Sequence, residues 1–291
     1  MIFIRKVIGI ALAAAVGLQL HYGILTNNCI VLREGGDVLG ERGNTPRASE
    51  ITESELTSRD LLHRNLTIHC ICVIVRTHPG QAKLLPITLL SLTQQSYQGA
   101  DVSISIFVVN TDSKGYAESE FMHVATADAN MKAGQKVVSV LDDSFHKKPP
   151  RKATYGYDGT DRALEHVLMG KTNCTHFLFT NGDNFYVRSL VEWIKPAILE
   201  GKQLIAWDFL THHKRDHNVI KVQFIRGHVD LGSVLVARQA IEMRRPHVKF
   251  LPDGEKTRDL FARDFFFFKE MYDHVGEQNT SSIHQVLFAH Q

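Results

Sequence analysis

The feature that most constrains the fold is a series of short apolar runs, separated by stretches that can form helices. Runs such as 68–75 (IHCICVIV) and 102–110 (VSISIFVVN) are rich in β-branched residues and suit strands buried on both faces of a parallel sheet. Strands that alternate with helices predict βαβ crossovers, hence an α/β fold with a mainly parallel, Rossmann-like sheet and helices on both faces. The predicted strands of this half are 68–75, 102–110, 136–141 and 176–180, and the predicted helices are 82–95, 116–129 and 160–168.

The second half of the chain departs from strict alternation. Three apolar runs follow one another without a helical stretch long enough for a crossover. We therefore expect this half to add strands of mixed direction. The predicted helices are 187–200 and about 257–272, and the predicted strands between them are 203–209, 219–225 and 231–237.

The N-terminus has the layout of a targeting segment. Arg5 and Lys6 precede an uncharged apolar run, 7–25. A positive flank followed by an apolar run directs a chain into the secretory pathway, with the basic residues in the cytosol. We expect 1–25 to be a cytosolic tip and signal anchor, giving a single-pass type II protein of the Golgi or ER membrane. A cleaved signal peptide, and hence a secreted protein, is the alternative.

The rest of the chain divides into a linker and a folded domain. Residues 26–65 are polar and glycine-rich and predict a stem, and 66–291 contain the predicted strands and helices. Three N-x-S/T sequons, at Asn65, Asn173 and Asn279, agree with a lumenal location of this domain.

The four cysteines do not form a recognisable metal or disulfide framework. They are too few for a disulfide scaffold and lack the paired spacing of a zinc site. Cys70 and Cys72 share one face of a predicted strand and are badly placed to bond to each other. We expect buried thiols, with a bond from either of them to Cys174 as the alternative.

Net charge excludes one class of partner. The chain has 33 Lys and Arg against 31 Asp and Glu, so it lacks the basic surplus of a protein that binds nucleic acid.

Polar residues follow several of the predicted strands at the point where each strand ends. Ligands of open α/β sheets bind beyond the carboxyl ends of the strands, so these residues predict a site at that edge. They are Arg76 and Thr77, 110–112, 142–143 and 181–184.

The last of these groups carries the clearest motif. In 176–186 (HFLFTNGDNFY), a polar turn with Asp183 follows an apolar trio. The segment resembles the hhhhDxD signature of GT-A glycosyltransferases, here written Asn181-Gly182-Asp183. The resemblance implies that Asp183 and Asn181 hold Mn²⁺ or Mg²⁺, which bridges the two phosphates of a nucleotide-sugar donor. Asn181 departs from the pattern because it brings no negative charge, and a turn-capping role for Asp183 is the alternative.

The resemblance extends over about 68–274. The segment 72–98 is similar to the opening of family-2-type glycosyltransferases, where a strand ends in a polar pair, here Arg76 and Thr77. VVNTDS places Asp112 where that family contacts the base or ribose of the donor. By the same resemblance Asp161 and Arg162, at the start of the helix that leads to the acidic turn, face the nucleotide. An Asp that stabilises a helix start is the alternative for Asp161.

Two further roles follow from the resemblance. Family members that invert configuration need a general base near the start of a late helix, which indicates Asp264, with Asp259 as second candidate. A surface carboxylate paired with Arg263 or Lys269 is the alternative role of Asp264. His284 is a candidate late metal ligand, although a chain with 16 histidines also places some by chance.

Taken together, these motifs predict a nucleotide-sugar-dependent glycosyltransferase. Its expected partners are a nucleotide-sugar donor, a glycan or glycoprotein acceptor, and the membrane through the N-terminal helix. A non-catalytic lumenal glycan-binding protein on the same fold is the alternative.

Overall fold

The structure describes most of the expected folded domain. The computed structural model covers residues 69–96, 102–111, 119–133, 138–141, 156–170, 172–212, 219–244, 249–252 and 259–290. The expected anchor and stem, 1–65, and the Asn65 sequon lie outside these residues. Within the described ranges, no helix combines the length and the apolar character needed to cross a bilayer.

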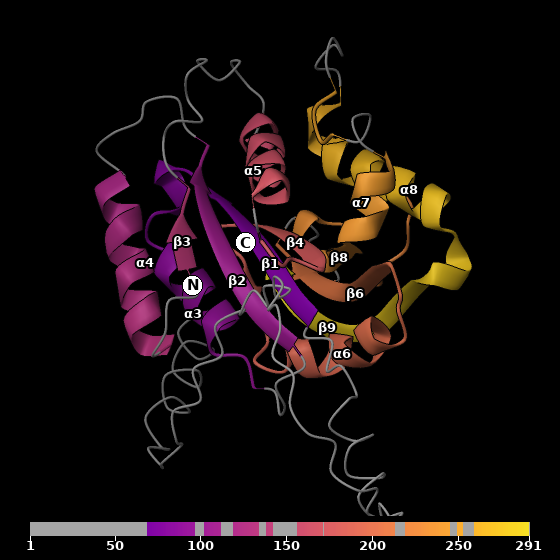
Figure 1. Cartoon of the computed structure of the whole chain (residues 1–291), viewed down its shortest axis with the longest axis horizontal. Coiled ribbons are helices and arrows are strands. Elements are labelled where there is room, and N and C mark those ends of the chain that lie inside the picture. The colour runs from indigo at the N-terminus through magenta and orange to yellow at the C-terminus, as the bar shows by residue number, and fades with distance from the viewer. Residues whose placement is uncertain are drawn as a thin grey trace, which may run out of the picture.

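A sheet of nine strands organises the described residues. Its order is β3-β2-β1-β4-β8-β6-β9-β5, with β7 paired to β6 (Figure 1). The β3-β2-β1-β4 half is parallel throughout, whereas β8 runs antiparallel to both β4 and β6, and β9 runs parallel to β6. The strands are β1 (His69–Thr77), β2 (Val102–Asn110), β3 (Val138–Val140), β4 (His176–Asn181), β5 (Phe185–Tyr186), β6 (Leu204–Thr211), β7 (Val219–Ile220), β8 (Val234–Ala237) and β9 (Thr280–His290).

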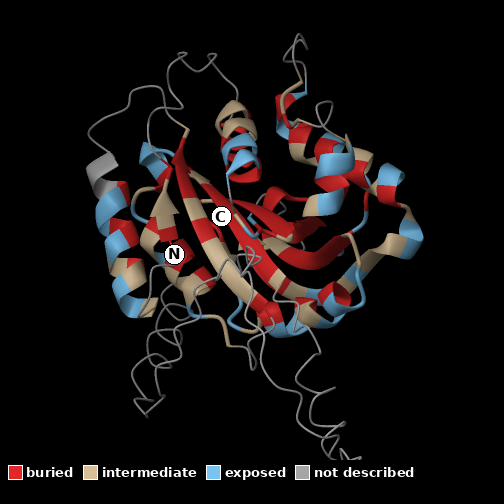
Figure 2. Ribbon diagram, viewed as in Figure 1, coloured by how far each residue is buried: buried red, intermediate tan, exposed pale blue. Residues whose placement is uncertain are grey.

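Helices cover both faces of this sheet, and each face has its own apolar cluster. The strands are buried between these layers (Figure 2). In β1, Cys72 and Ile74 pack into one cluster, and Ile71 and Val73 pack into the other. On the first face lie α5 (Tyr157–Met169), α7 (Arg238–Arg244) and α8 (Arg263–Val275); on the second lie α3 (Leu85–Thr93), α4 (Ser119–Ala133) and α6 (Leu190–Leu199).

The prediction of an α/β domain with a parallel first half is confirmed, and the second half differs in detail. The strand predicted at 219–225 is only two residues long, and the one predicted at 231–237 begins as a 3-10 turn, η4 (Leu231–Ser233). Strand β9 was not predicted. The exposed residues of β9 are polar, and its pairing with β6 shifts register twice around Trp207, Asp208 and Phe209. Its sequence therefore lacks the regular alternation of apolar and polar residues by which a strand is recognised.

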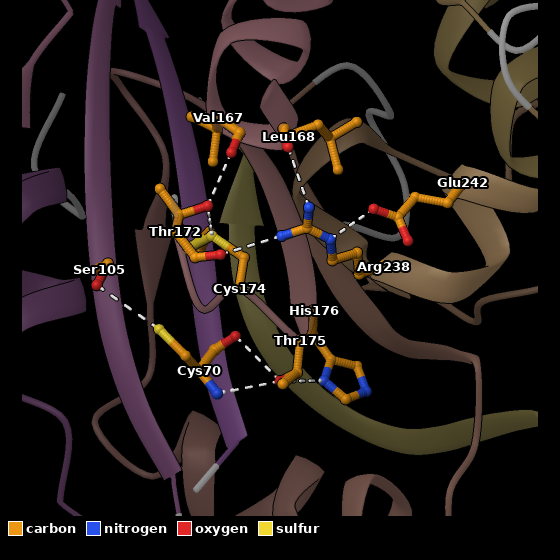
Figure 3. The surroundings of a disulfide bond; sticks show 11 residues. Cys70, Ser105, Val167, Leu168, Thr172, Cys174, Thr175, His176, Arg238 and Glu242 are labelled. Carbon is orange, nitrogen blue, oxygen red and sulfur yellow. Dashed lines mark hydrogen bonds and ion pairs between the residues drawn. A yellow bond between two sulfur atoms is a disulfide. The ribbon is translucent and has the colours of Figure 1, made fainter. Parts of the chain in front are cut away.

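A disulfide joins Cys72 in β1 to Cys174, just before β4 (Figure 3). The expectation of buried thiols is therefore wrong for these two, because the parallel pairing of β1 and β4 brings together residues 102 apart in sequence. Cys70 keeps its thiol, whose sulfur lies 3.7 Å from Ser105 Oγ. Closing a loop of this length stabilises the fold by about 4–5 kcal/mol in the chain-entropy account.

Arg238 holds the connection that leads into β4. Its two terminal nitrogens donate to the carbonyls of Leu168 and Thr172, and its Nε donates to Glu242 (Figure 3). The guanidinium thus occupies carbonyls at the C-terminus of α5, where a cation is favoured. Together with the disulfide, it fixes the beginning of β4, and the opposite end of β4 carries the acidic turn.

His176, the first residue of β4, gives a prediction on stability. It is buried, and burial, with a smaller effect of nearby His69, lowers its pKa from 6.5 to about 4. Below pH 6.5 the unfolded chain binds a proton here that the folded chain takes up only near pH 4. Stability should therefore fall as the pH drops through this window, by up to about 3 kcal/mol.

The measurement is urea unfolding of the wild type and of His176→Gln at pH 7, 5.5 and 4.5. The variant has no proton to bind at this position, so the stability difference between the two proteins should change with pH. A constant difference would contradict the prediction.

Candidate functional site

The acidic turn after β4 is held rigidly against β1 and α3. Gly182 donates its N–H to the carbonyl of Arg76 (2.9 Å) and accepts from Thr88 Oγ1 (2.9 Å). A side chain at Gly182 would bring a Cβ to 2.7 Å from Thr77 Oγ1, so only glycine fits. The turn therefore presents its flanking side chains, Asn181 and Asp183, in fixed positions at the carboxyl edge of the sheet.

Asp183 has an oxygen that the protein itself does not satisfy. Its Oδ1 is buried and has no hydrogen-bond partner. A buried carboxylate oxygen without a donor or counter-ion is costly, so such an atom suits a ligand or cation that supplies positive charge.

Asn181 makes a different contact from the one expected of a metal ligand. Its Oδ1 accepts a short hydrogen bond, 2.5 Å, from Arg76 Nε. The guanidinium carbon of Arg76 also lies 4.4 Å from the ring centroid of Tyr157 in α5. The amide oxygen of Asn181 is therefore engaged by Arg76, and its role as a metal ligand stays a prediction.

Asp264 lies in the first turn of α8, within electrostatic range of this group. Burial of its carboxyl, and then the charge of Asp230, raise its pKa to about 7, while Arg76 and His290 act in the opposite direction. The charge of Asp264 is also felt by Tyr157, whose pKa is raised to about 12, mainly by burial. Asp264 therefore shares the site with Arg76, Tyr157 and Asp230.

His290, the last residue of β9, completes the group. Its Nδ1 lies 2.9 Å from Asp230 Oδ2. Burial alone would lower the pKa of His290, but the hydrogen bond and charge of Asp230, with the charges of Asp183 and Asp264, raise it. Asp230 is fixed in turn by a capping box at η4, where its carboxylate accepts from the N–H of Gly232 (3.0 Å).

Of the residues predicted from sequence, the structure brings Arg76, Asn181, Asp183 and Asp264 together. Thr77 is buried beneath the turn, where its carbonyl accepts from Thr111 N (2.8 Å). Asp112, expected at the base or ribose, lies outside the described residues.

Three other candidates have partners elsewhere. Asp259 pairs with Arg226 on the surface (3.3 Å), which leaves Asp264 as the better candidate for the base. The side chain of His284 is 63% exposed, and its Nδ1 lies 3.4 Å from Asp208 Oδ1. Arg162 pairs with Asp158 one turn earlier in α5 (3.1 Å).

Asp161 has a structural position. Its two carboxylate oxygens accept from the N–H groups of Phe250 (2.8 Å) and Leu251 (2.9 Å). Its pKa is raised to about 7 by burial, as for Asp264, so a raised pKa does not by itself distinguish the two acids. Their hydrogen bonds differ, because both oxygens of Asp161 accept from backbone N–H groups, whereas Asp264 accepts one, from Phe265 N (2.8 Å), and lies near Asp230, Arg76 and His290.

Sequence reasoning missed Tyr157, Asp230 and His290. The last of these had a usable signal, since His290 follows an apolar run, 286–289, as the other strand-end polar residues do. Tyr157 and Asp230 were not among the predicted site residues, and the packing of α5 and η4 against the sheet brings them to the site.

The described residues contain no cluster of three or more His, Cys, Asp or Glu side chains that could hold a metal by itself. Mg²⁺ in phosphate-transfer sites is held by one or two carboxylates, with substrate phosphates and water as the other ligands. The unsatisfied oxygen of Asp183 fits that incomplete type of donor set.

Comparison with known proteins agrees with this architecture. No model of a known protein family matches the sequence, and no curated protein matches it. Among solved structures, TarS of S. aureus superposes with a TM-score of 0.50 at 12% identity over 75% of this chain and 36% of TarS. A structure of TarS 1–349 in complex with UDP gives the same TM-score and identity, and this chain spans 60% of it. The fold is of the GT-A type.

A second similar structure extends over more of the chain. Glucosyl-3-phosphoglycerate synthase of Mycobacterium tuberculosis, in complex with Mg²⁺ and UDP, has a TM-score of 0.46 at 15% identity over 84% of this chain and 77% of that enzyme.

Asp161 supplies a prediction that separates structure from function. Asp161→Ala should lower the free energy of unfolding by about 2 kcal/mol, because it leaves two backbone N–H groups without acceptors. Asp273→Ala, which breaks the exposed ion pair with Lys269, should cost about 0.5 kcal/mol or less. Urea unfolding measures both. The increase in melting temperature produced by UDP and Mn²⁺ should be the same in Asp161→Ala as in the wild type. Loss of that increase would indicate that Asp161 contacts the nucleotide after all.

Proposed function

We propose that this chain is a glycosyltransferase that moves a sugar from a nucleoside-diphosphate donor to a hydroxyl of a glycan or glycoprotein, assisted by Mn²⁺ or Mg²⁺. The observation that carries the proposal is the convergence of Arg76, Asp183, Asp264 and His290 at one edge of a GT-A-type sheet. TarS 1–349, which shares the fold, has been solved with UDP, and this supports a nucleoside diphosphate as ligand here.

The divalent ion would be held by Asp183, with His290 as the second protein ligand. When bound, it stabilises the negative charge that develops on the diphosphate leaving group. Asp230 positions His290 by fixing its Nδ1 at 2.9 Å, and such a partner orients the ring of a metal-binding histidine. His290 replaces the earlier candidate His284, which pairs with Asp208.

Asp264 is the proposed general base for the acceptor hydroxyl. A base works best when its pKa is close to the working pH, and burial with the charge of Asp230 raises the pKa of Asp264 to about 7. Asp264 as a whole residue is only partly buried, although its carboxyl is largely removed from solvent. Arg76 and His290 limit the rise in its pKa, which keeps a useful fraction ionised near neutral pH.

The test is a screen of nucleotide sugars with the full chain and Mn²⁺, following donor hydrolysis and transfer. Asp264→Asn should lower turnover by about 10²-fold or more with little change in donor affinity, because only the proton acceptor is lost. Asp183→Asn should weaken both Mn²⁺ and donor binding. His284→Gln is the matched control and should behave like the wild type.

Donor binding without turnover in the wild type would instead support the non-catalytic glycan-binding alternative. Full activity in Asp264→Asn would show that Asp264 is not the general base.

We also infer that the domain is lumenal, in a membrane-anchored type II protein of the Golgi or ER or in a secreted one. Disulfides persist in oxidising compartments, and the bond between Cys72 and Cys174 supports this location. The exposed Asn173 begins the sequon that contains Cys174. The side chain of Asn279, by contrast, donates to Val275 O (2.7 Å).

Glycosylation tests this location. Expressed from its own N-terminus in a eukaryotic secretory host, the Asn65→Gln chain should carry an N-glycan that an amidase removes, seen as a mass shift. Asn173→Gln in that background should abolish the shift, and Asn279→Gln should retain it. A chain that is unmodified at all three sequons would count against the lumenal assignment.

A further inference from the structure

Arg76 is held from two sides at the centre of the site. Its Nε donates to Asn181 Oδ1 at 2.5 Å, and its guanidinium lies against the Tyr157 ring at 4.4 Å. Tyr157 itself is 4% exposed and stacks on Phe250, so it cannot move aside freely. The guanidinium therefore has a defined position before any ligand binds, which lowers the entropy lost on binding.

The positive charge of Arg76 is not cancelled by direct contact. Across the described part of the chain, no carboxylate oxygen lies within 4.0 Å of its guanidinium nitrogens, and the side chains that it contacts, Asn181 and Tyr157, are neutral. Its Nη1 is buried without a hydrogen-bond partner. A partly buried guanidinium whose N–H group lacks an acceptor has an unfavourable desolvation energy, and a bound anion would offset it.

The surroundings indicate which anion. Arg76 lies beside the turn that carries Asp183, since its carbonyl accepts from Gly182 N (2.9 Å). Its charge also reaches Asp264, the proposed base. An anion bound here would therefore lie between the acidic turn and Asp264, the proposed base for the acceptor hydroxyl. This is the position expected of a donor diphosphate. A guanidinium fork matches phosphate oxygens in geometry as well as in charge.

We propose that Arg76 is a direct ligand of the donor diphosphate, and that Asn181 holds it there without neutralising it, so that the chain binds a nucleoside diphosphate even with no divalent cation. This proposal rests on the proposed function and adds to it a second, metal-independent source of positive charge.

The identity of residue 181 is the decisive detail. An aspartate there would accept the same hydrogen bond from Arg76 Nε, but it would form an ion pair and cancel the charge that the diphosphate needs. Asparagine has the same shape and supplies the same acceptor atom. Arg76 and Asn181 therefore act together: the neutral Asn181 fixes the position of the Arg76 guanidinium without cancelling its charge.

The experiment measures binding of inorganic pyrophosphate, UDP and GDP to the full chain by titration calorimetry, once with EDTA and once with Mn²⁺. In EDTA the wild type should bind pyrophosphate and at least one nucleotide. Arg76→Met should weaken this binding at least tenfold. Arg226→Met, which removes an exposed arginine paired with Asp259, is the matched control and should leave it unchanged.

Asn181→Asp is the second variant, chosen because it is isosteric and keeps Arg76 in the chain. It should weaken binding in EDTA at least tenfold and increase the gain produced by Mn²⁺, because the turn then has two carboxylates. Unfolding would weaken binding under both conditions, so it would not produce weaker binding in EDTA together with a larger gain from Mn²⁺. Circular dichroism of each variant checks that it is folded.

The outcomes separate this proposal from the proposed function. Binding that needs Mn²⁺ in the wild type, or that Arg76→Met and Asn181→Asp leave unchanged in EDTA, overturns the role of Arg76 and leaves the glycosyltransferase proposal standing. No binding of any nucleotide or of pyrophosphate under either condition overturns both.

Discussion

The site depends on the register between two parallel strands. Arg76, next to last in β1, lies opposite Asn181, the last residue of β4, so the hydrogen bond between their side chains follows from the pairing itself. A slip of one residue would turn Arg76 toward the opposite face of the sheet. Two features oppose such a slip. Alternate residues of β1 pack into the apolar clusters on opposite faces of the sheet, and the Cys72–Cys174 bond ties β1 to the chain just before β4. The disulfide thus helps to set the geometry of the site from the other end of β4.

The second constraint is electrostatic, because the site brings like charges close together. Burial of Asp264, and then the charge of Asp230, make ionisation of Asp264 costly and raise its pKa to about 7. His290 relieves part of this cost by pairing with Asp230, and its own pKa is raised in return. The contact with Asp230 also sets the orientation of the imidazole ring. The same pairing therefore stabilises the folded site and prepares it for a ligand.

The sequence predicted those parts of the fold and site that local pattern determines. Strands β1, β2 and β4, the turn at Asp183 and the acid at the start of α8 all carry short-range signals, namely buried runs, a glycine turn and a helix start. His290 and Asp230 reach the site only through β9 and η4, whose positions depend on an irregular pairing with β6 and on packing against the sheet. The sequence analysis indicates His284 and not His290, because the strand that ends at His290 is not predicted from the sequence.

The departure at position 181 has a physical meaning that a motif comparison alone does not give. If 181 were an aspartate and 76 a neutral residue, positions 76, 181 and 183 would sum to a formal charge of −2, and a diphosphate would be repelled until a dication bound. In this chain Arg76, Asn181 and Asp183 contribute +1, 0 and −1, which sum to 0. The repulsion is removed by a covalently attached cation whose position is set by a strand pairing. Under the proposed function, binding of the donor and binding of the metal are then separate events, and the metal would stabilise charge that develops during the reaction.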